Sequence, residues 1–344
     1  MYIQEDDLKL NDWQFAQRKY LPYETKLRLT ETRIREWHYN WAGQVYLSYS
    51  GGLDSTVLLH MIRKELGNDV PAVFSNTGLE FPEIVRFARK APGVFEEIYP
   101  RDKNGKRITF KRIVDQYGFP LISKETAMKI EKLRHGKLSE KYRNYLLNGD
   151  ERGKFGMLAK KWRFLLDTEF DTSQKCCDKM KKKPFKEYEK RTGRKPYVGT
   201  TQDEGFMRAH LYASTGCNVY DGNKIKSQPL GFWNRQDVLR YVVENGVEIC
   251  SVYGDIKQDQ QGNYYTTGEQ RTGCMFCGFG AHLEEEPNRF QRMSVTHPKH
   301  YEICMNLESN GVKYKDALET CGICTETWEQ IGQMDIFDFI GGMQ

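Results

Sequence analysis

The sequence of 344 residues has no apolar run of about 18 or more residues, the length that predicts a membrane-spanning helix. Residues 1–7 lack the basic and apolar regions of a signal peptide. The chain also lacks internal repeats and low-complexity segments. We therefore expect a cytoplasmic protein with no membrane partner. Its length allows one large α/β core with appendages or two modest domains.

Disulfide bonds are not expected, although the chain contains nine cysteines. A reducing compartment keeps thiols free and so works against a disulfide framework. Two Cys-x-x-Cys pairs, Cys274 with Cys277 and Cys321 with Cys324, indicate metal or redox chemistry instead.

The charge is mild in total and uneven in distribution. The net charge is +5, yet residues 124–195 contain 22 Lys and Arg against 11 Asp and Glu, which leaves −6 for the rest. A basic segment of this kind attracts nucleic acid, an acidic protein or polyphosphate, but solvated helix faces have the same composition. Aromatic residues interleave the charges and suit either base stacking or a helical core: Tyr142, Tyr145, Phe155, Trp162 and Phe164.

The most informative segment is glycine-rich and reads Ser-Gly-Gly-Leu-Asp-Ser at Ser50–Ser55. It lies between a strand-like run, Gln44–Tyr49, and a helix-like run, Thr56–Ile62. Paired glycines let backbone N–H groups approach an anion, and Asp54 and Ser55 are expected to cap the following helix. These features predict a phosphate site. The Lys-Ser/Thr ending of a Walker loop is missing, so Walker-type handling of Mg²⁺ and γ-phosphate is not implied. An ordinary strand-to-helix turn remains the alternative.

Strands and helices alternate after this loop. We expect strands at Val70–Ser75 and Val94–Tyr99 with a helix at Pro82–Lys90 between them. This order predicts an α/β fold with a doubly wound parallel sheet, covered by helices on both faces. Ligands bind at the carboxyl ends of such strands, where both Ser50–Ser55 and Asn76–Gly78 fall. The two motifs should meet in space.

The remaining segments suggest a three-part organisation. Residues 1–42 form a helical N-terminal cap, with a helix from about Tyr23 to Trp37. Residues 43–245 form the nucleotide-binding domain, which returns to strand at Lys195–Gly199 and ends with a helix over Asn234–Asn245. A basic helical insertion, 124–195, lies within it, and residues 246–344 form a Cys-rich C-terminal region.

The loop resembles the PP-loop of ATP pyrophosphatases, whose pattern is Ser-Gly-Gly-x-Asp-Ser. Three later segments look like the phosphoadenosine phosphosulfate (PAPS) reductase family of that superfamily. Phe74–Glu83 is similar to its Asp-Thr-Gly-x-x-Phe-Pro-Glu segment, with Asn76 in place of Asp. Gly199–Glu204 with Arg208 resembles its nucleotide-contacting turn, and Pro229–Trp233 followed by Asp237 and Val238 resembles its Pro-Leu-x-x-Trp segment. The likeness covers roughly residues 43–280.

This resemblance implies a Rossmann-like, adenine nucleotide alpha hydrolase-like fold that binds ATP with Mg²⁺. It implies Asp54 and Ser55 as catalytic residues. The nucleotide would be held by Ser48, Ser50, Gly51, Gly52, Leu53, Asp54, Ser55, Asn76, Thr77, Gly78, Gly199, Glu204 and Arg208.

Four cysteines are candidate metal ligands: Cys176, Cys177, Cys274 and Cys277. A Cys-Cys pair with a Cys-x-x-Cys pair resembles the four-iron (4Fe-4S) cluster ligands of assimilatory adenylylsulfate reductases. Adjacent cysteines suit an iron–sulfur cluster better than tetrahedral zinc, because neighbouring side chains reach two separate irons. Zinc held by Cys274 and Cys277 with Cys321 and Cys324 is the alternative.

The reaction implied by the resemblance is ATP-dependent adenylation of a substrate with release of pyrophosphate. Loop N–H groups from Gly51 to Ser55 would hold the leaving phosphates. Cluster-assisted sulfur transfer would follow, with nucleic acid as a candidate acceptor and a sulfur donor protein as a candidate partner. Two alternatives remain open. A sulfonucleotide (PAPS/APS) reductase needs a catalytic cysteine, and here Thr320–Cys324 has no following histidine. A non-catalytic, metal-stabilised nucleotide-binding module is suggested by Asn76.

Overall fold

The computed structural model describes residues 17–153, 155–202, 216–220, 222 and 225–327. The chain divides into two compact units, one formed by residues 1–100 and 183–272 and the other by residues 101–182 and 273–344. The segment boundaries expected from the sequence, at residues 42, 124, 195 and 245, are drawn from composition and not from packing. They stay a prediction. Glu204 and Arg208, two of the expected nucleotide ligands, lie outside the described residues.

The first unit contains a six-stranded sheet with the order β3-β2-β1-β5-β7-β6. All pairs are parallel except β6 with β7. The predicted α/β fold is therefore confirmed, with an antiparallel strand at one edge. The strands are β1 (Val45–Tyr49), β2 (Ala72–Ser75), β3 (Phe95–Ile98), β5 (Lys195–Val198), β6 (Asn218–Val219) and β7 (Lys226–Ser227).

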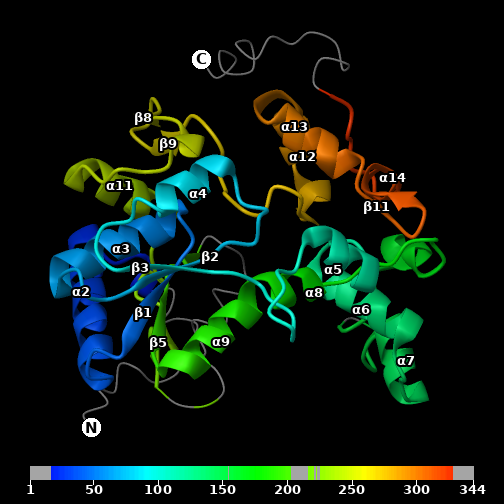
Figure 1. The fold of residues 1–344 in the computed structure, drawn as a ribbon, viewed down its shortest axis with the longest axis horizontal. Coiled ribbons are helices and arrows are strands. Elements are labelled where there is room, and N and C mark those ends of the chain that lie inside the picture. Colours follow the sequence, from blue (N-terminus) through cyan, green and yellow to red (C-terminus); the bar gives the residue numbers. More distant parts are fainter. Residues whose placement is uncertain (1–16, 154, 203–215, 221, 223–224, 328–344) are drawn as a thin grey trace. The chain divides into compact units, whose positions relative to one another are not determined.

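Helices cover both faces of this sheet (Figure 1). Alternate residues of β1 point to opposite faces, so Leu47 joins the larger core while Tyr46 joins a smaller one. In the smaller core, Tyr188 packs against Tyr46 from α9 (Lys183–Thr192). The larger core receives α2 (Tyr23–Asn40), α3 (Leu53–Leu66), α4 (Pro82–Ala88) and α11 (Arg235–Asn245).

The N-terminal helix α2 is an integral part of the first unit. Its Lys26 side chain is buried and lies 2.6 Å from the carboxylate of Asp237 on α11. Thr30 accepts a hydrogen bond from the buried indole N–H of Trp233 at 2.9 Å. Helix α11 begins and ends as predicted, with a capping box at Asn234 and a left-handed Gly246 (φ 58°). The unit also contains a short 3₁₀ helix, Ser251–Tyr253, and a hairpin of β8 (Ile256–Gln258) and β9 (Tyr264–Thr266).

The second unit is mostly helical, and it contains most of the segment 124–195 that was expected to be helical. A short parallel pair, β4 (Leu121–Ile122) with β10 (Gly278–Phe279), joins its two chain segments. A second short pair is antiparallel and consists of β11 (Glu308–Ser309) and β12 (Val312–Lys313). The helices are α5 (Phe110–Tyr117), α6 (Lys124–His135), α7 (Glu140–Asn148), a 3₁₀ helix (Lys160–Leu166), α8 (Lys175–Cys177), a π-helix (Asp178–Lys182), a 3₁₀ helix (Ala281–Leu283), α12 (Arg289–Thr296), α13 (Pro298–Met305) and α14 (Tyr314–Thr320).

Candidate functional site

The glycine-rich loop lies where the strand order of the sheet reverses. The chain runs from β1 to β2 and β3 on one side, and then returns to β5 on the other side of β1. Ligands bind at this kind of switch point, beyond the carboxyl ends of the strands. Ser50–Ser55 follow β1, and Gly199 follows β5, whose Val198 pairs with Ser48 of β1. The sheet therefore brings these predicted nucleotide-binding residues to the same edge.

Hydroxyl groups hold the loop in shape. Gly51 has φ +68°, a left-handed conformation that favours glycine. The Ser50 and Ser55 side-chain oxygens lie 2.9 Å apart, within hydrogen-bond distance. The Gly52 N–H donates to Ser50 Oγ at 3.2 Å, and Ser55 Oγ donates to the Gly52 carbonyl at 2.9 Å.

The predicted capping role of Asp54 and Ser55 is wrong. Helix α3 begins at Leu53 and Gly52 is its N-cap, so both residues lie inside the first helical turn. A glycine at this position has no side chain with which to cap the first N–H groups of the helix. Asp54 places an acidic group in the first turn of the helix.

Gly199 is packed tightly against the start of α3. A Cβ atom at this position would lie 2.9 Å from Ser55 Cα and 3.0 Å from Ser55 N, closer than real side chains come to backbone. A Cβ on Gly52 would likewise lie 3.1 Å from Thr272 Oγ1. The absence of side chains at these two positions keeps the loop at the end of β5 and the helix N-terminus together, which suits the close approach of an anion.

Tyr253 and Thr272 complete the loop, and sequence reasoning missed both. The Leu53 N–H donates to Tyr253 Oη at 2.9 Å, and Tyr253 Oη shares a hydrogen bond with Thr272 Oγ1 at 2.7 Å. Tyr253 is buried, and burial raises the pKa of its hydroxyl. The Arg235 guanidinium lies 5.8 Å from the centroid of its ring. No local pattern marks a tyrosine 200 residues after the loop as its partner.

The segment after β2 is fixed by charged neighbours. The Asn76 Nδ2 donates to Glu97 Oε1 at 2.6 Å, and the Gly78 N–H donates to Asn76 Oδ1 at 2.9 Å. Two hydrogen bonds from Arg89, at 2.9 and 3.0 Å, hold Glu97. The Arg89 hydrogen bond, with help from Asn76, lowers the pKa of Glu97 to about 2. Thr77 donates from its N–H and from its hydroxyl to the Glu80 carboxylate, at 3.0 and 2.8 Å.

This geometry explains why asparagine stands at position 76. An aspartate there would place a second carboxylate against Glu97, whereas the asparagine amide donates a hydrogen bond to it. Because Tyr49 of β1 pairs with Phe74 of β2, the segment from Asn76 follows the same sheet edge as the glycine-rich loop.

The candidate cysteine ligands all belong to the second unit. Burial raises the pKa of the Cys176 thiol, and the thiols of Cys274, Cys177 and Cys277 raise that pKa further. Each of these three thiols therefore lies close enough to Cys176 to influence its charge. Cys274 and Cys277 form a turn in which the Cys277 N–H donates to the Cys274 carbonyl at 3.1 Å. In the described residues, however, no three His, Cys, Asp or Glu side chains already form a metal site.

Cys277 has both buried surroundings and groups that could stabilise a thiolate. Burial, with a contribution from the Cys177 thiol, raises the pKa of the Cys277 thiol, and a hydrogen bond from the Phe279 backbone and the nearby cations Arg289 and Lys181 offset part of this rise. Metal ligation requires thiolates, which N–H donors and cations stabilise. In number and in chemistry these donors fit an iron–sulfur cluster.

The second Cys-x-x-Cys pair has a different environment. Burial raises the pKa of Cys321 to about 12. Burial also raises the pKa of Cys324, as do the carboxylates of Glu286, Glu326 and Glu319. Neither cysteine is among the groups that shift the pKa of Cys277 or Cys176. Zinc held by Cys274 and Cys277 with Cys321 and Cys324 stays the alternative.

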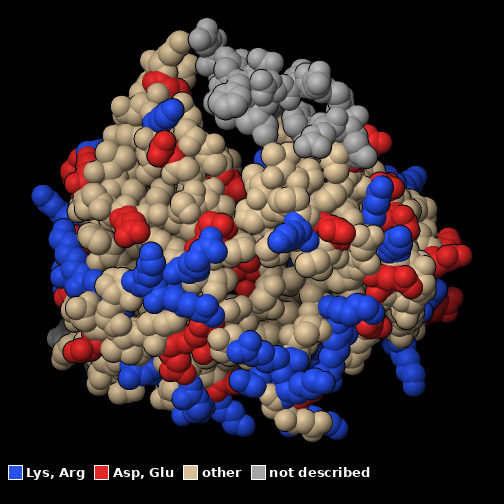
Figure 2. Space-filling view, turned by 45° about the horizontal axis from the view of Figure 1, so that its top comes forward, with Lys and Arg blue, Asp and Glu red and all other residues tan. Residues whose placement is uncertain are grey.

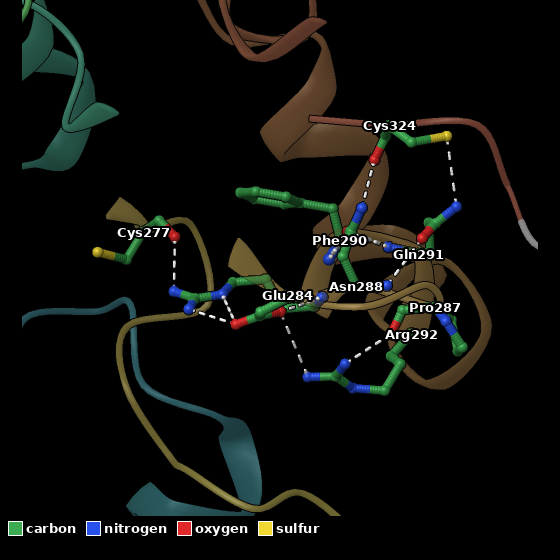
Figure 3. Close-up of polar contacts among 9 residues, drawn as sticks. Cys277, Glu284, Pro287, Asn288, Phe290, Gln291, Arg292 and Cys324 are labelled. Carbon is green, nitrogen blue, oxygen red and sulfur yellow. Dashed lines mark hydrogen bonds and ion pairs between the residues drawn. The ribbon is translucent and has the colours of Figure 1, made fainter. Parts of the chain in front are cut away.

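Helix α12 links both cysteine turns, as Figure 3 shows. Arg289 donates from Nη1 to the Cys277 carbonyl at 2.9 Å and from Nε to Glu284 Oε1 at 2.8 Å. Beside it, Asn288 caps the helix and donates from Nδ2 to the Cys324 carbonyl at 2.7 Å. Arg289 is therefore a support of the Cys274–Cys277 turn that sequence reasoning missed.

Residues 44–278 match the family described as the phosphoadenosine phosphosulfate reductase domain. The match covers more than half of the chain, and the protein belongs to this family. The fold and the PP-loop resemblance are thereby confirmed. Among the described residues, no helix combines the length and the apolar character needed to cross a membrane.

Particular relatives are distant. An uncharacterized protein of Methanocaldococcus jannaschii is 24% identical over 236 residues, which are 68% of this chain and 36% of that protein. The chain thus spans about a third of that relative's length. A PAPS reductase from Candida auris, solved with phosphate, is 16% identical with a TM-score of 0.36, covering 75% of this chain and 99% of its own. The U34-tRNA thiolase NcsA from Methanococcus maripaludis, solved with its 4Fe-4S cluster, is 12% identical with a TM-score of 0.34, covering 92% and 85%.

Proposed function

We propose that this protein is an ATP-dependent PP-loop enzyme of the cytoplasm that adenylates a substrate, releases pyrophosphate and then transfers sulfur with the help of an iron–sulfur cluster. The observation that carries the proposal is the intact Ser-Gly-Gly-x-Asp-Ser loop at the switch point of the sheet, with Gly199 packed against Ser55. Nucleic acid is the proposed acceptor, and a sulfur donor protein the proposed partner.

The chemistry follows from what the loop offers. An oxygen of the acceptor attacks the α-phosphorus of ATP, the bond to the bridging oxygen breaks, and pyrophosphate leaves. The positive end of α3 and the loop N–H groups stabilise the leaving phosphates. Asp54 is the only carboxylate within Ser50–Ser55, so we assign it to the Mg²⁺ ion that offsets phosphate charge. Tyr253 keeps the Leu53 N–H engaged, which leaves the N–H groups further into the helix to meet the phosphates.

The second unit supplies the sulfur chemistry in this proposal. Cys176, Cys177, Cys274 and Cys277 would hold the cluster, whose chemistry would be to supply the sulfur that replaces AMP on the adenylated acceptor. Lys181 and Arg289 favour the thiolate form of these ligands, as described above for Cys277. Zinc in place of the cluster is the alternative that metal analysis decides.

Sulfonucleotide reduction is the second candidate, and the state of Cys321 argues against it. A reductase needs a reactive thiolate to attack sulfur. Cys321 is 3% exposed, and burial raises its pKa to about 12, so it is neither accessible nor ionised at neutral pH. The non-catalytic module ranks last, because Asn76 is held by Glu97 in an ordered segment.

The proposal is tested on protein purified without oxygen. We expect a brown protein, ATP-dependent pyrophosphate release with bulk tRNA or DNA, and loss of that release in Asp54→Ala. The matched control is Asp69→Ala, an exposed carboxylate of the same unit. A colourless protein with stoichiometric zinc would exclude the cluster. Sulfite formation from PAPS and thioredoxin, abolished by Cys321→Ser, would establish the reductase instead.

A further inference from the structure

One part of the basic segment holds most of its excess positive charge. Residues 132–163 contain ten Lys and Arg against three Asp and Glu, a net charge of +7. Five exposed cations among them form no ion pair within the described part of the chain: Lys137, Lys141, Arg152, Lys160 and Lys161.

Elsewhere in the segment, four lysines are paired with carboxylates. Lys129, Lys175, Lys182 and Lys183 each lie within 4 Å of a carboxylate, at 2.6, 3.7, 2.8 and 3.4 Å. Such pairs are what an ordinary solvated helix face provides. Unpaired cations concentrated in one stretch instead create a positive field that attracts a polyanion. On the face drawn in Figure 2, Lys and Arg form several groups, and Asp and Glu lie beside some of them.

Aromatic rings are exposed in the same stretch. Phe155 is 68% exposed, Phe164 41% and Tyr145 37%. The Tyr145 ring packs closely against Gly156, where a Cβ atom would lie only 2.0 Å from Tyr145 Cζ. The same ring stacks on Tyr142, with the ring centroids 6.2 Å apart. These two contacts hold the Tyr145 ring in place. Fixed rings that face solvent form a platform on which bases stack.

Helix α7 and the following loop form one body. The Leu158 N–H donates to the Leu146 carbonyl at 2.7 Å, and the Asp150 N–H donates to the Phe155 carbonyl at 2.9 Å. One face of α7 lines an open hollow of about 490 Å³, with Glu140, Lys141, Arg143, Asn144 and Leu147 along it. The polar groups, cations and aromatic rings of this stretch therefore belong to one packed structure, formed by α7 and the loop that follows it.

We propose that the surface formed by residues 137–153 and 155–164 binds a single-stranded segment of nucleic acid, with its lysines and arginines on the phosphates and its exposed rings against unpaired bases. An acidic peptide would satisfy the cations but leave the rings in water, and a duplex hides its base faces. Only the role of the bound strand as acceptor rests on the proposed function. The binding itself does not.

The test measures binding of labelled oligonucleotides to the full chain by fluorescence anisotropy over a series of salt concentrations. We expect single strands to bind more tightly than a duplex or polyglutamate, with affinity falling as salt rises. RNA and DNA strands run in parallel identify which nucleic acid is preferred. Polyglutamate binding as tight as the single strands would overturn the proposal.

Variants separate stacking from charge. Phe155→Ala should weaken binding about 5-fold or more, the loss expected for one stacked base. The control is Tyr265→Ala, a ring of the first unit that is 43% exposed. Lys160→Ala and Lys161→Ala should each lower the salt slope by about one, and Lys257→Ala, an exposed lysine of β8, should not. The proposal would be refuted if the control and test variants changed oligonucleotide binding equally, or if the test variants left binding unchanged. Pyrophosphate release, measured on the same samples, reports separately on the proposed function.

Discussion

Replacing Asn76 by Asp restores the residue typical of the family and should nevertheless destabilise this protein. In the structure Asn76 Nδ2 lies 2.6 Å from Glu97 Oε1, so the substitution exchanges a hydrogen bond for two facing carboxylates. Two unit charges at 4 Å repel by about 4 kcal/mol at an effective dielectric constant of 20. Partial exposure and the Arg89 charge reduce this value. We expect a loss of about 2 kcal/mol in the free energy of unfolding at pH 7.

The loss of stability caused by Asn76→Asp should also change with pH in a defined direction. Arg89 and Asn76 lower the pKa of Glu97 to about 2, so in the native protein Glu97 contributes stability above the ordinary value of 4.5 and loses it as the pH falls toward 2. With an aspartate at position 76, the two carboxylates share a proton and the pKa of the pair rises. The folded variant then binds more protons than the unfolded chain, and its deficit relative to the native protein should grow as the pH rises from about 5 to 8.

Urea denaturation of a double-mutant cycle measures this coupling. Asn76→Asp combined with Glu97→Gln should recover most of the loss, because the glutamine amide donates to the new carboxylate. The control is Glu83→Gln, which removes a surface partner of Arg86 and should change stability by less than about 1 kcal/mol. An Asn76→Asp variant as stable as the native protein, or one that Glu97→Gln fails to rescue, would refute the reasoning.

Three further predictions concern other parts of the chain. Lys26→Met leaves the buried Asp237 carboxylate unpaired and should cost about 3–5 kcal/mol in urea denaturation; an unchanged midpoint would contradict it. Gly199→Ala forces a Cβ to within 3 Å of the start of α3 and should weaken ATP binding, measured by calorimetry, more than tenfold with the fold retained; native affinity would argue against a nucleotide at this loop. Arg289→Gln should lower iron content after anaerobic reconstitution, whereas Arg292→Gln, on the same helix but without a bond to a candidate ligand, should not.

The sequence predicted those parts of the fold whose signals are local. Val45–Tyr49 alternates between two buried faces, and Leu53–Leu66 follows a glycine pair, so strand, loop and helix could be read directly. The alternation of strands and helices predicted the parallel sheet and the edge shared by the loop and Asn76. Helix α11 was bounded correctly because its capping residues are encoded beside it.

Residues that act across long sequence separations could not be predicted in this way. Tyr253 reaches the Leu53 N–H from a 3₁₀ turn with no pattern of its own, and Arg289 reaches the Cys277 carbonyl from the next helix. The capping error at Asp54 has a different cause. In sequence, a glycine N-cap followed by an acidic first turn looks the same as an aspartate N-cap. Only the backbone geometry distinguishes the two.

The departure of this chain from its family at position 76 is best understood together with Glu97. A lone change from Asp to Asn would suggest a weakened site, and it prompted the idea of a module without turnover. In the structure the carboxylate is present one strand away, neutralised by Arg89, and the asparagine amide is the group that can pair with it while still accepting the Gly78 N–H. Asn76 and Glu97 thus form one coupled unit, in which the family's aspartate would be the disruptive residue. The change at position 76 therefore gives no reason to expect a site without turnover.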